Sequence, residues 1–160
     1  AEMGRMIDPY LLADKDQPST WWCFYKQNGA SISWSTDLIN WTYFGHVEAG
    51  ENVCLLLEEG EYILFHSPKN GIGVKRSRDF KSWIDHGLLT LGQKDWPWAQ
   101  GRLTAGHVLD LRDDPTVGKY VMFFHGSSSE GCAVQETHGH ASLALAWSDD
   151  LEHWEWPLVT

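Results

Sequence analysis

Three ionisable side chains stand at the beginnings of apolar, strand-like stretches of this 160-residue sequence. Asp8 precedes "PYLLA", Glu51 precedes "NVCLLL", and His107 lies in "GHVLDL". General acid–base chemistry needs such groups to converge on one point. If the three stretches are equivalent strands of neighbouring units, we expect Asp8, Glu51 and His107 to occupy equivalent positions and to meet at one end of the fold.

Each of these residues also has a simpler interpretation. Asp8, before Pro9, is typical of a turn at the start of a strand. Glu51 could be a solvated loop carboxylate, and Glu48 is the alternative acid if the register shifts by three residues. His107 could be a neutral, hydrogen-bonded core histidine. The choice depends on the elements that position these residues.

A repeated turn motif sets the spacing of those elements. Ser-x-Asp-(Leu or Phe)-x-x-Trp occurs at residues 35–41, 77–83 and 148–154. Three strand-like segments precede each copy, separated by turns rich in Asn, Asp, Gly and Pro, and a fourth segment begins at the Trp of the motif. Four short antiparallel strands that recur at about forty residues are typical of β-propeller blades.

The sequence therefore predicts an all-β fold: one domain over residues 1–160, with about three four-stranded antiparallel blades of a partial β-propeller. The approximate blade boundaries are 6–47, 48–91 and 103–160. Two insertions, at 88–104 and 127–140, are rich in polar and aromatic residues, as binding loops are. In the first insertion, Trp96 and Trp98 are candidates for stacking on a sugar ring, although both could simply belong to a surface loop.

Composition argues against several kinds of partner. The chain has 22 acidic and 12 basic residues, so we expect no binding to nucleic acid or to anionic membranes, which attract basic surfaces. The sequence shows no apolar run long enough for a transmembrane helix and no visible signal peptide, and the compartment stays open. Three cysteines without a Cys-x-x-Cys spacing predict neither a disulfide framework nor a cysteine-based zinc site.

The ordered set of motifs resembles the five-bladed β-propeller glycoside hydrolases, most closely family 43 and its clan relatives in families 32, 68, 62 and 117. "IDPYLLAD" is similar to the Asp-Pro strand of their second blade, "ENVCLLLEEGEYILFHSP" to the third-blade strand that carries the acid glutamate, and "TAGHVLDLRDDPTVGKYVMFFHG" to the fourth-blade Gly-His strand. The resemblance covers residues 6 to 157, or blades two to four. It implies hydrolysis of glycosidic bonds in oligo- or polysaccharides, with inversion.

The resemblance also implies roles for single residues. Glu51 would be the general acid that protonates the leaving oxygen, and Asp8 would orient it and favour its protonated form through like charge. His107 would line the channel and contact substrate or a calcium ion there; the resemblance implies no required cofactor. No residue matches the first-blade aspartate that serves as the base, and inversion needs two carboxylates. We therefore expect little hydrolysis by this chain alone.

Two other functions stay open at this point. A non-catalytic carbohydrate-binding or scaffold propeller would use its acids only to hydrogen-bond sugar hydroxyls. An enzyme like the mannoside phosphorylases would need a cluster of basic residues for phosphate, and the sequence has few. Three blades do not close a ring, so the outer faces of the first and third blades would expose apolar surface. We expect a piece of a larger enzyme in origin, and self-association that covers the open faces.

Overall fold

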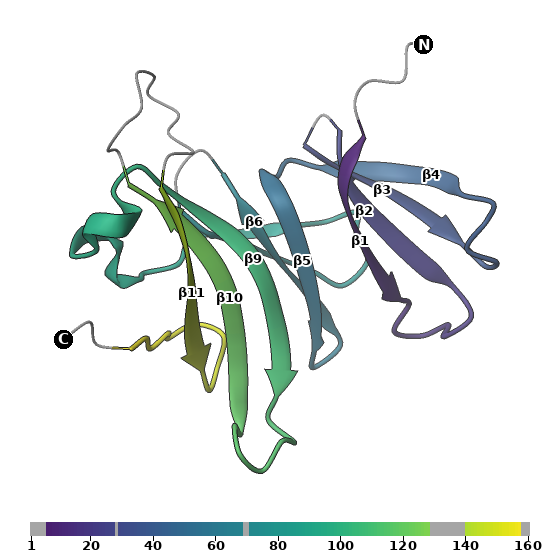
Figure 1. Cartoon of the computed structure of the whole chain (residues 1–160). Helices are drawn as coiled ribbons and strands as arrows, with labels where there is room; N and C mark the ends of the chain where they lie inside the picture. Colours follow the sequence, from purple (N-terminus) through teal and green to yellow (C-terminus); the bar gives the residue numbers. More distant parts are fainter. Residues whose placement is uncertain (1–5, 28, 69–70, 129–139, 158–160) are drawn as a thin grey trace.

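The computed structural model describes residues 6–27, 29–68, 71–128 and 140–157. Three antiparallel sheets follow one another along the chain (Figure 1). The first contains β1 (Ile7–Ala13), β2 (Trp21–Lys26), β3 (Ala30–Ser35) and β4 (Thr42–Val47), and the second contains β5 (Glu51–Glu58), β6 (Glu61–Ser67), β7 (Gly73–Ser77) and β8 (Ile84–Leu88). The third contains β9 (Arg102–Leu111), β10 (Lys119–Ser127) and β11 (Ala141–Ser148). The predicted all-β fold is confirmed.

The third sheet differs from the expected four strands. Its fourth strand is reduced, among the described residues, to one antiparallel bridge between Trp147 and Glu155. The backbones of these two residues exchange hydrogen bonds of 2.9 and 2.8 Å, and the Trp147 indole donates a further 2.7 Å bond to the Glu155 carboxylate. The segment after the third turn motif therefore follows the same path as β4 and β8, over a shorter length.

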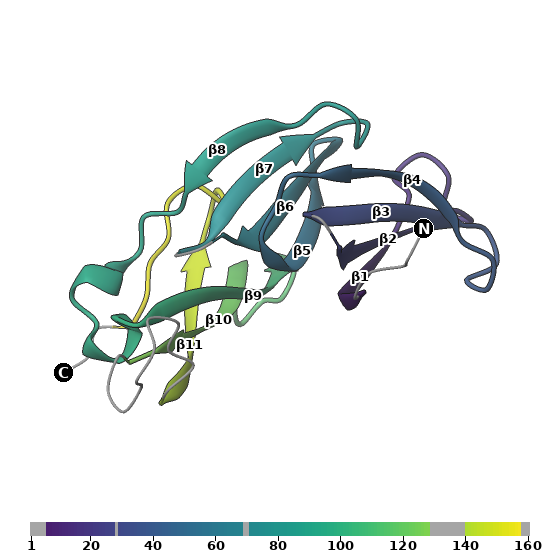
Figure 2. The same ribbon diagram turned by 90° about the horizontal axis from the view of Figure 1, so that it is seen from above.

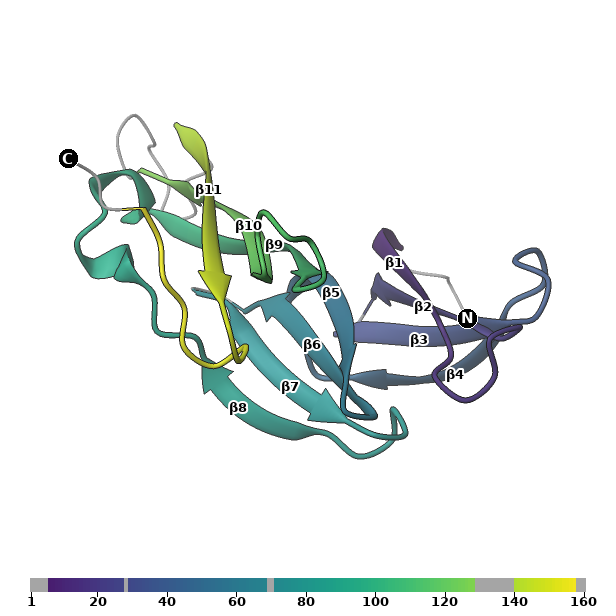
Figure 3. The ribbon, with the colours of Figure 1, turned by 90° about the horizontal axis from the view of Figure 1, so that it is seen from below.

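The first strand of each sheet lies on the inside of the arrangement. β5 contacts both β1 and β9, and the three strands lie close together in Figure 2, where β4 and β8 lie further out. Seen from below in Figure 3, the sheets splay away from these inner strands like the blades of an incomplete propeller. The first residues of β5 and β9, Glu51 and Arg102, contact each other in this arrangement.

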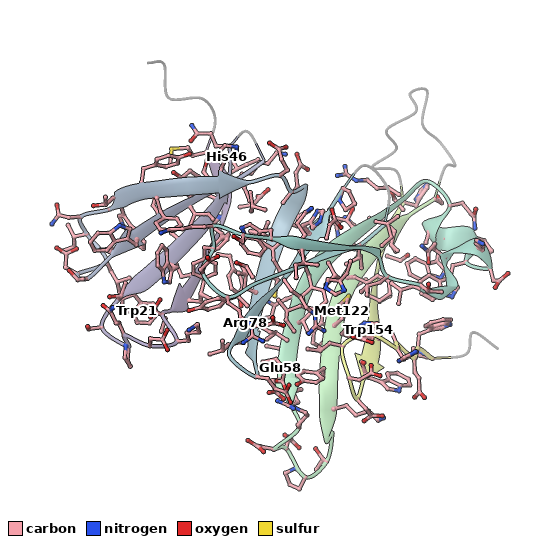
Figure 4. All side chains as sticks on the ribbon, turned by 180° about the vertical axis from the view of Figure 1, so that it is seen from behind. Trp21, His46, Glu58, Arg78, Met122 and Trp154 are labelled. Atoms are coloured by element: carbon pink, nitrogen blue, oxygen red, sulfur yellow. The ribbon has the colours of Figure 1, made fainter. Side chains whose placement is uncertain are left out.

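The central strands of the middle sheet are buried on both faces, whereas its edge strand β8 is exposed. Along β6, Tyr62 and Leu64 point into a core shared with the first sheet, whereas Ile63 and Phe65 point into a core shared with the third. This follows from the period of two in a strand, which sends successive side chains to opposite faces. Met122 and Trp154, labelled in Figure 4, belong to the second of these cores.

Tyrosine hydroxyls connect neighbouring sheets at the far ends of the inner strands. Tyr62 of the second sheet accepts a 2.9 Å bond from the Lys15 amide of the first sheet and donates toward Asp14 at 3.5 Å. Tyr120 of the third sheet donates a 2.6 Å bond to Glu58 of the second, which is labelled in Figure 4. The two tyrosines occupy equivalent positions, since each pairs with the serine of its own turn motif.

An arginine strengthens the second of these junctions. Arg112 binds both carboxylate oxygens of Glu58, at 3.1 and 2.8 Å, and also contacts Asp110. Its guanidinium lies over the Tyr120 ring, 4.3 Å from the centroid. Contact with Asp110 lowers the pKa of that carboxyl group. Bidentate arginine–carboxylate geometry of this kind is the more stable form of surface ion pair.

The repeated turn motif is held by side-chain bonds to its own backbone. In the second copy, the buried Ser77 Oγ accepts bonds from the amides of Asp79 and Phe80, and Asp79 Oδ1 accepts bonds from the amides of Lys81 and Ser82. The other two copies make the same contacts. These bonds compensate for the left-handed conformation of the fourth motif residue, whose φ is +60° at Leu38 and Phe80 and +66° at Leu151.

The loop before the third sheet is shorter than the predicted insertion 88–104, because β9 begins at Arg102. It contains two single-turn 3₁₀ helices, η1 (Gly92–Lys94) and η2 (Pro97–Ala99). Most of the second insertion, residues 129–139, lies outside the described residues. In the described part of the chain, no helix is long and apolar enough to cross a membrane.

The turn geometry predicts the effect of removing one hydroxyl. Ser77→Ala should lower the free energy of unfolding by about 1–2 kcal/mol, because two amides lose their acceptor at a buried position. Urea unfolding followed by circular dichroism measures the change. Ser82→Ala, at an exposed position of the same turn, is the matched control and should change stability by less than about 0.5 kcal/mol. Equal effects of the two substitutions would contradict this account of the motif.

Candidate active site

Each inner strand contains an irregularity near its start. In β1 the register shifts between Ile7 and Tyr10, and in β5 it shifts between Glu51 and Cys54. The second residue of each strand, Asp8 or Asn52, has a positive φ, +54° and +53°. Such a bulge adds a residue to one strand and changes which side chains are equivalent. Asp8 is therefore equivalent to Asn52, not to Glu51.

The third sheet completes this comparison. His107 pairs with Phe123, as Tyr10 pairs with Phe24 and Cys54 with Phe65. Tyr10, Cys54 and His107 are thus the equivalent residues of the three inner strands. The prediction that Asp8, Glu51 and His107 occupy equivalent positions is wrong, because the ends of the apolar runs do not reveal the bulges.

Glu51 is the first residue of β5, and 41% of its side chain is exposed. Arg102, the first residue of β9, places Nη2 3.4 Å from Glu51 Oε2. A half-exposed carboxylate that contacts a largely buried guanidinium can exchange a proton with a ligand while staying anchored. Sequence reasoning missed Arg102; the only available signal was an arginine in an aromatic-rich insertion, five residues before His107.

The two other carboxylates near this region lie apart from that contact. Asp8 is exposed in the bulge of β1, and among the described residues it forms no side-chain hydrogen bond with Glu51. Its role beside Glu51 stays a prediction. Glu48, the alternative acid, is exposed in the segment before β5 and lies 3.7 Å from His46, which is labelled in Figure 4.

His107 joins a small cluster built from all three inner strands. Cys54 Sγ lies 3.7 Å from His107 Nδ1, and the rings of Tyr10 and His107 are 5.8 Å apart. Tyr10 Oη donates a 2.9 Å bond to the Leu55 carbonyl. Burial raises the pKa values of Cys54 and Tyr10, so both groups are protonated at neutral pH. His107 itself is exposed at this position, rather than enclosed in a core.

This cluster does not suit a calcium ion. Calcium takes six to eight oxygen ligands, whereas the contacts of His107 in this cluster are a thiol and an aromatic ring. Among the residues with described positions, no group of three or more His, Cys, Asp or Glu side chains could hold a metal ion.

The tryptophans of the first insertion pack against the third sheet. Trp96 is only 6% exposed; its ring stacks on Trp98 at 5.0 Å and on Phe124 at 5.8 Å, and meets Trp156 edge-on. Trp96 thus serves as a core residue here. Trp98 is partly exposed. Its stacking on a sugar ring stays a prediction.

Apolar grooves lie on the two outer sheets. One, of about 480 Å³, is lined by residues of β10 and β11 together with Trp98 and Trp156. The other, of about 330 Å³, lies on the first sheet beside Pro9 and Cys23. Large apolar side chains are exposed on these sheets, among them Leu143 (77%) and Leu11 (50%). Within the described residues, no further sheet packs against these two faces.

Comparison with known proteins gives matches in structure only. No protein-family model and no curated protein sequence matches the chain. The structure is similar to the endo-arabinase from Bacteroides thetaiotaomicron VPI-5482, with a TM-score of 0.69 and 18% identity over 97% of this chain and 55% of the other. It is also similar to a thermostable family-43 glycoside hydrolase, with a TM-score of 0.67 and 15% identity over 95% and 51% of the two chains.

A third similar structure is the complex of β-1,2-mannobiose phosphorylase from Listeria innocua with β-1,2-mannobiose. Its TM-score is 0.65, with 21% identity over 90% of this chain and 40% of the other. The chain therefore spans about half the length of these proteins. At such low identity the likeness establishes the fold alone, a partial β-propeller similar to part of these proteins.

The inner-strand cluster predicts an unreactive thiol. Iodoacetamide should not alkylate Cys54 in the folded chain at neutral pH, because the thiol is buried and its raised pKa leaves little thiolate. Mass spectrometry of tryptic peptides should show labelling of Cys54 only as urea unfolds the chain. Cys23, which is half-buried, is the internal control and should label sooner. Equal rates for both cysteines in the folded chain would contradict the packing described.

Proposed function

We propose that the region around Glu51 and Arg102 is part of a glycoside-hydrolase site that acts on oligo- or polysaccharides with inversion. The observation that carries this proposal is the half-exposed Glu51 carboxylate at the start of an inner strand, in contact with Arg102. The similarity to glycoside hydrolases in fold supports it. The residue that the sequence resemblance assigns as general acid is thus accessible to a ligand.

In the proposed reaction, Glu51 gives its proton to the leaving glycosidic oxygen and becomes a carboxylate. Arg102 stabilises that charged form, since a nearby cation favours an ionised carboxyl group. Asp8 acts in the opposite sense, as a negative charge that favours the protonated acid before bond cleavage. Inversion also needs a base that activates water on the opposite face of the sugar, and the sequence resemblance assigns no such residue in this chain. The chain alone should therefore bind sugar better than it cleaves it.

One comparison favours a second candidate reaction. The similarity to a mannobiose phosphorylase raises the prospect of cleavage by phosphate instead of water. Phosphate needs cationic partners, and Arg102, the cation nearest to Glu51 in the described structure, is engaged by that carboxylate. Hydrolysis is therefore the better-supported proposal. Phosphate dependence of any bond cleavage separates the two.

The proposed site predicts a specific response to sugars. Titration of the ¹⁵N-labelled chain with arabino-, xylo- and manno-oligosaccharides should shift the amide signals of Glu51 and Arg102, and Arg102→Gln should weaken binding about tenfold through loss of a charged hydrogen bond. Arg78→Gln, at an exposed position, is the matched control and should leave binding unchanged. If no sugar in this series shifts these signals, the proposed function is wrong.

The same proposal predicts weak turnover. At high protein concentration, release of nitrophenol from aryl arabinosides, xylosides and mannosides should be slow with or without phosphate, and Glu51→Gln should abolish what remains. Fast hydrolysis that depends on Glu51 would show that this chain contains its own base. Fast release only in the presence of phosphate would favour the phosphorylase alternative.

We further propose that the chain associates with itself through the open faces of its first and third sheets, since exposed apolar surface favours association. Light scattering after size-exclusion chromatography should give at least twice the 18.2 kDa of one chain. Combined Leu11→Lys and Leu143→Lys substitutions should reduce the measured mass. Ile84→Lys, on the exposed strand β8, is the control. A monomer at high concentration would rule the association out.

A further inference from the structure

A buried histidine contacts the backbone next to the proposed acid, Glu51. His66, on β6, is 6% exposed, and its Nδ1 accepts a 2.9 Å bond from the amide of Gly50. Gly50 immediately precedes Glu51 in the sequence. An imidazole nitrogen that accepts an N–H bond must be unprotonated, so this contact requires neutral His66 with its proton on Nε2.

Two glycines allow the backbone to approach this ring. A methyl group built on Gly50 would overlap the backbone carbonyl of Ser67, so only glycine fits there. On the other side, a methyl group on Gly73 would lie 2.5 Å from His66 Nε2. Gly73 pairs with His66 in the sheet. The imidazole is therefore enclosed between β7 and the segment that leads into β5.

The next residue of β6 connects the same segment to the third sheet. Ser67 pairs with Glu51, and its Oγ accepts a 2.7 Å bond from the amide of Ala105 on β9. β9 also carries Arg102, whose guanidinium contacts Glu51. One end of β6 thus fixes both partners of the Glu51–Arg102 contact, with His66 on the Glu51 side and Ser67 on the Arg102 side.

We propose that His66 is a positioning residue for Glu51: by accepting the Gly50 amide bond, it holds the start of β5 against β6 so that the Glu51 carboxylate stays beside Arg102. This inference rests on the proposed function, in which Glu51 is the general acid. The histidine does not contact substrate in this proposal. It acts through the backbone of residues 50–51.

The charges around His66 support its neutral state. Burial and the Lys75 ammonium, from β7, lower the pKa of His66 from its usual 6.5 to about 4, and Asp85, from β8, acts in the opposite sense. Lys75 and Asp85 form an ion pair with each other. On the side of β5, the nearest ionisable group in the sequence is Glu51, which directly follows Gly50. The Gly50 bond should therefore persist from neutral pH down to about pH 4, and break when the ring takes up a second proton.

Nuclear magnetic resonance of the ¹⁵N,¹³C-labelled chain tests this directly. In His66→Phe, the Gly50 amide should lose its protection from hydrogen exchange. The Arg102 side-chain N–H signals should move toward those of the Glu51→Ala variant, because the Glu51 carboxylate no longer lies beside the guanidinium. His66→Asn offers an acceptor oxygen in place of Nδ1 and should restore both the protection and the Arg102 signals. His86→Phe, the same change at an exposed histidine, is the control and should alter neither.

The outcomes separate this inference from the proposed function. Loss of Gly50 protection with unchanged Arg102 side-chain signals would show that His66 is only structural, and would overturn the proposal. Failure of the sugar titration would reject the glycosidase function while leaving the Arg102 signals interpretable. If His66→Phe does not fold, a pH titration of the unmodified chain decides: the Gly50 amide signal and the Arg102 side-chain N–H signals must both move together with the His66 ring signals near pH 4. Arg102 signals that move independently of His66 would overturn the proposal.

Discussion

Strand β6 of the middle sheet is buried on both of its faces, and the positions of the other two sheets depend on it. β6 sends Tyr62 and Leu64 into one core and Ile63 and Phe65 into the other. Each outer sheet therefore has one face that is packed and one that is not. Because fully burying one large apolar side chain contributes about 1.5–3 kcal/mol, the two inner cores are the main source of stability that the described residues show. The inner strands, and with them Glu51, are held in place by these cores.

Much of this architecture could be predicted from the sequence. The three copies of the turn motif mark where a third strand ends, and period-two patterns mark the strands before it, so the order and approximate limits of the strands follow from local signals. The sequence predicts a full fourth strand in the third sheet. In the described residues that strand is a single bridge between Glu155 and Trp147. The length of an edge strand depends on how neighbouring segments pack, and the residue pattern of the strand itself does not predict that.

The candidate site was harder to predict than the fold. The resemblance pointed to Glu51 at the start of an inner strand, where the structure places it, but its role and that of Asp8 stay proposals. The bulges that make Asp8 equivalent to Asn52 arise from single residues with positive φ, for which aspartate and asparagine give only a weak sequence signal. Arg102 and His66 act through contacts between segments far apart in sequence. Trp96 looked like a binding residue because loops often bind ligands, yet its ring is packed in the core.

The tyrosine–acid contacts between sheets have a consequence for how three similar units keep their order during folding. Asp14 meets Tyr62 and Glu58 meets Tyr120, but the first sheet has Trp21 at the tyrosine position (labelled in Figure 4). If the first sheet docked in the place of the third, no hydroxyl would reach Glu58, and a partly buried carboxylate would lose a hydrogen bond. Repeated units are prone to exchange with one another while they fold. Trp21 in place of a tyrosine therefore disfavours docking of the first sheet against Glu58.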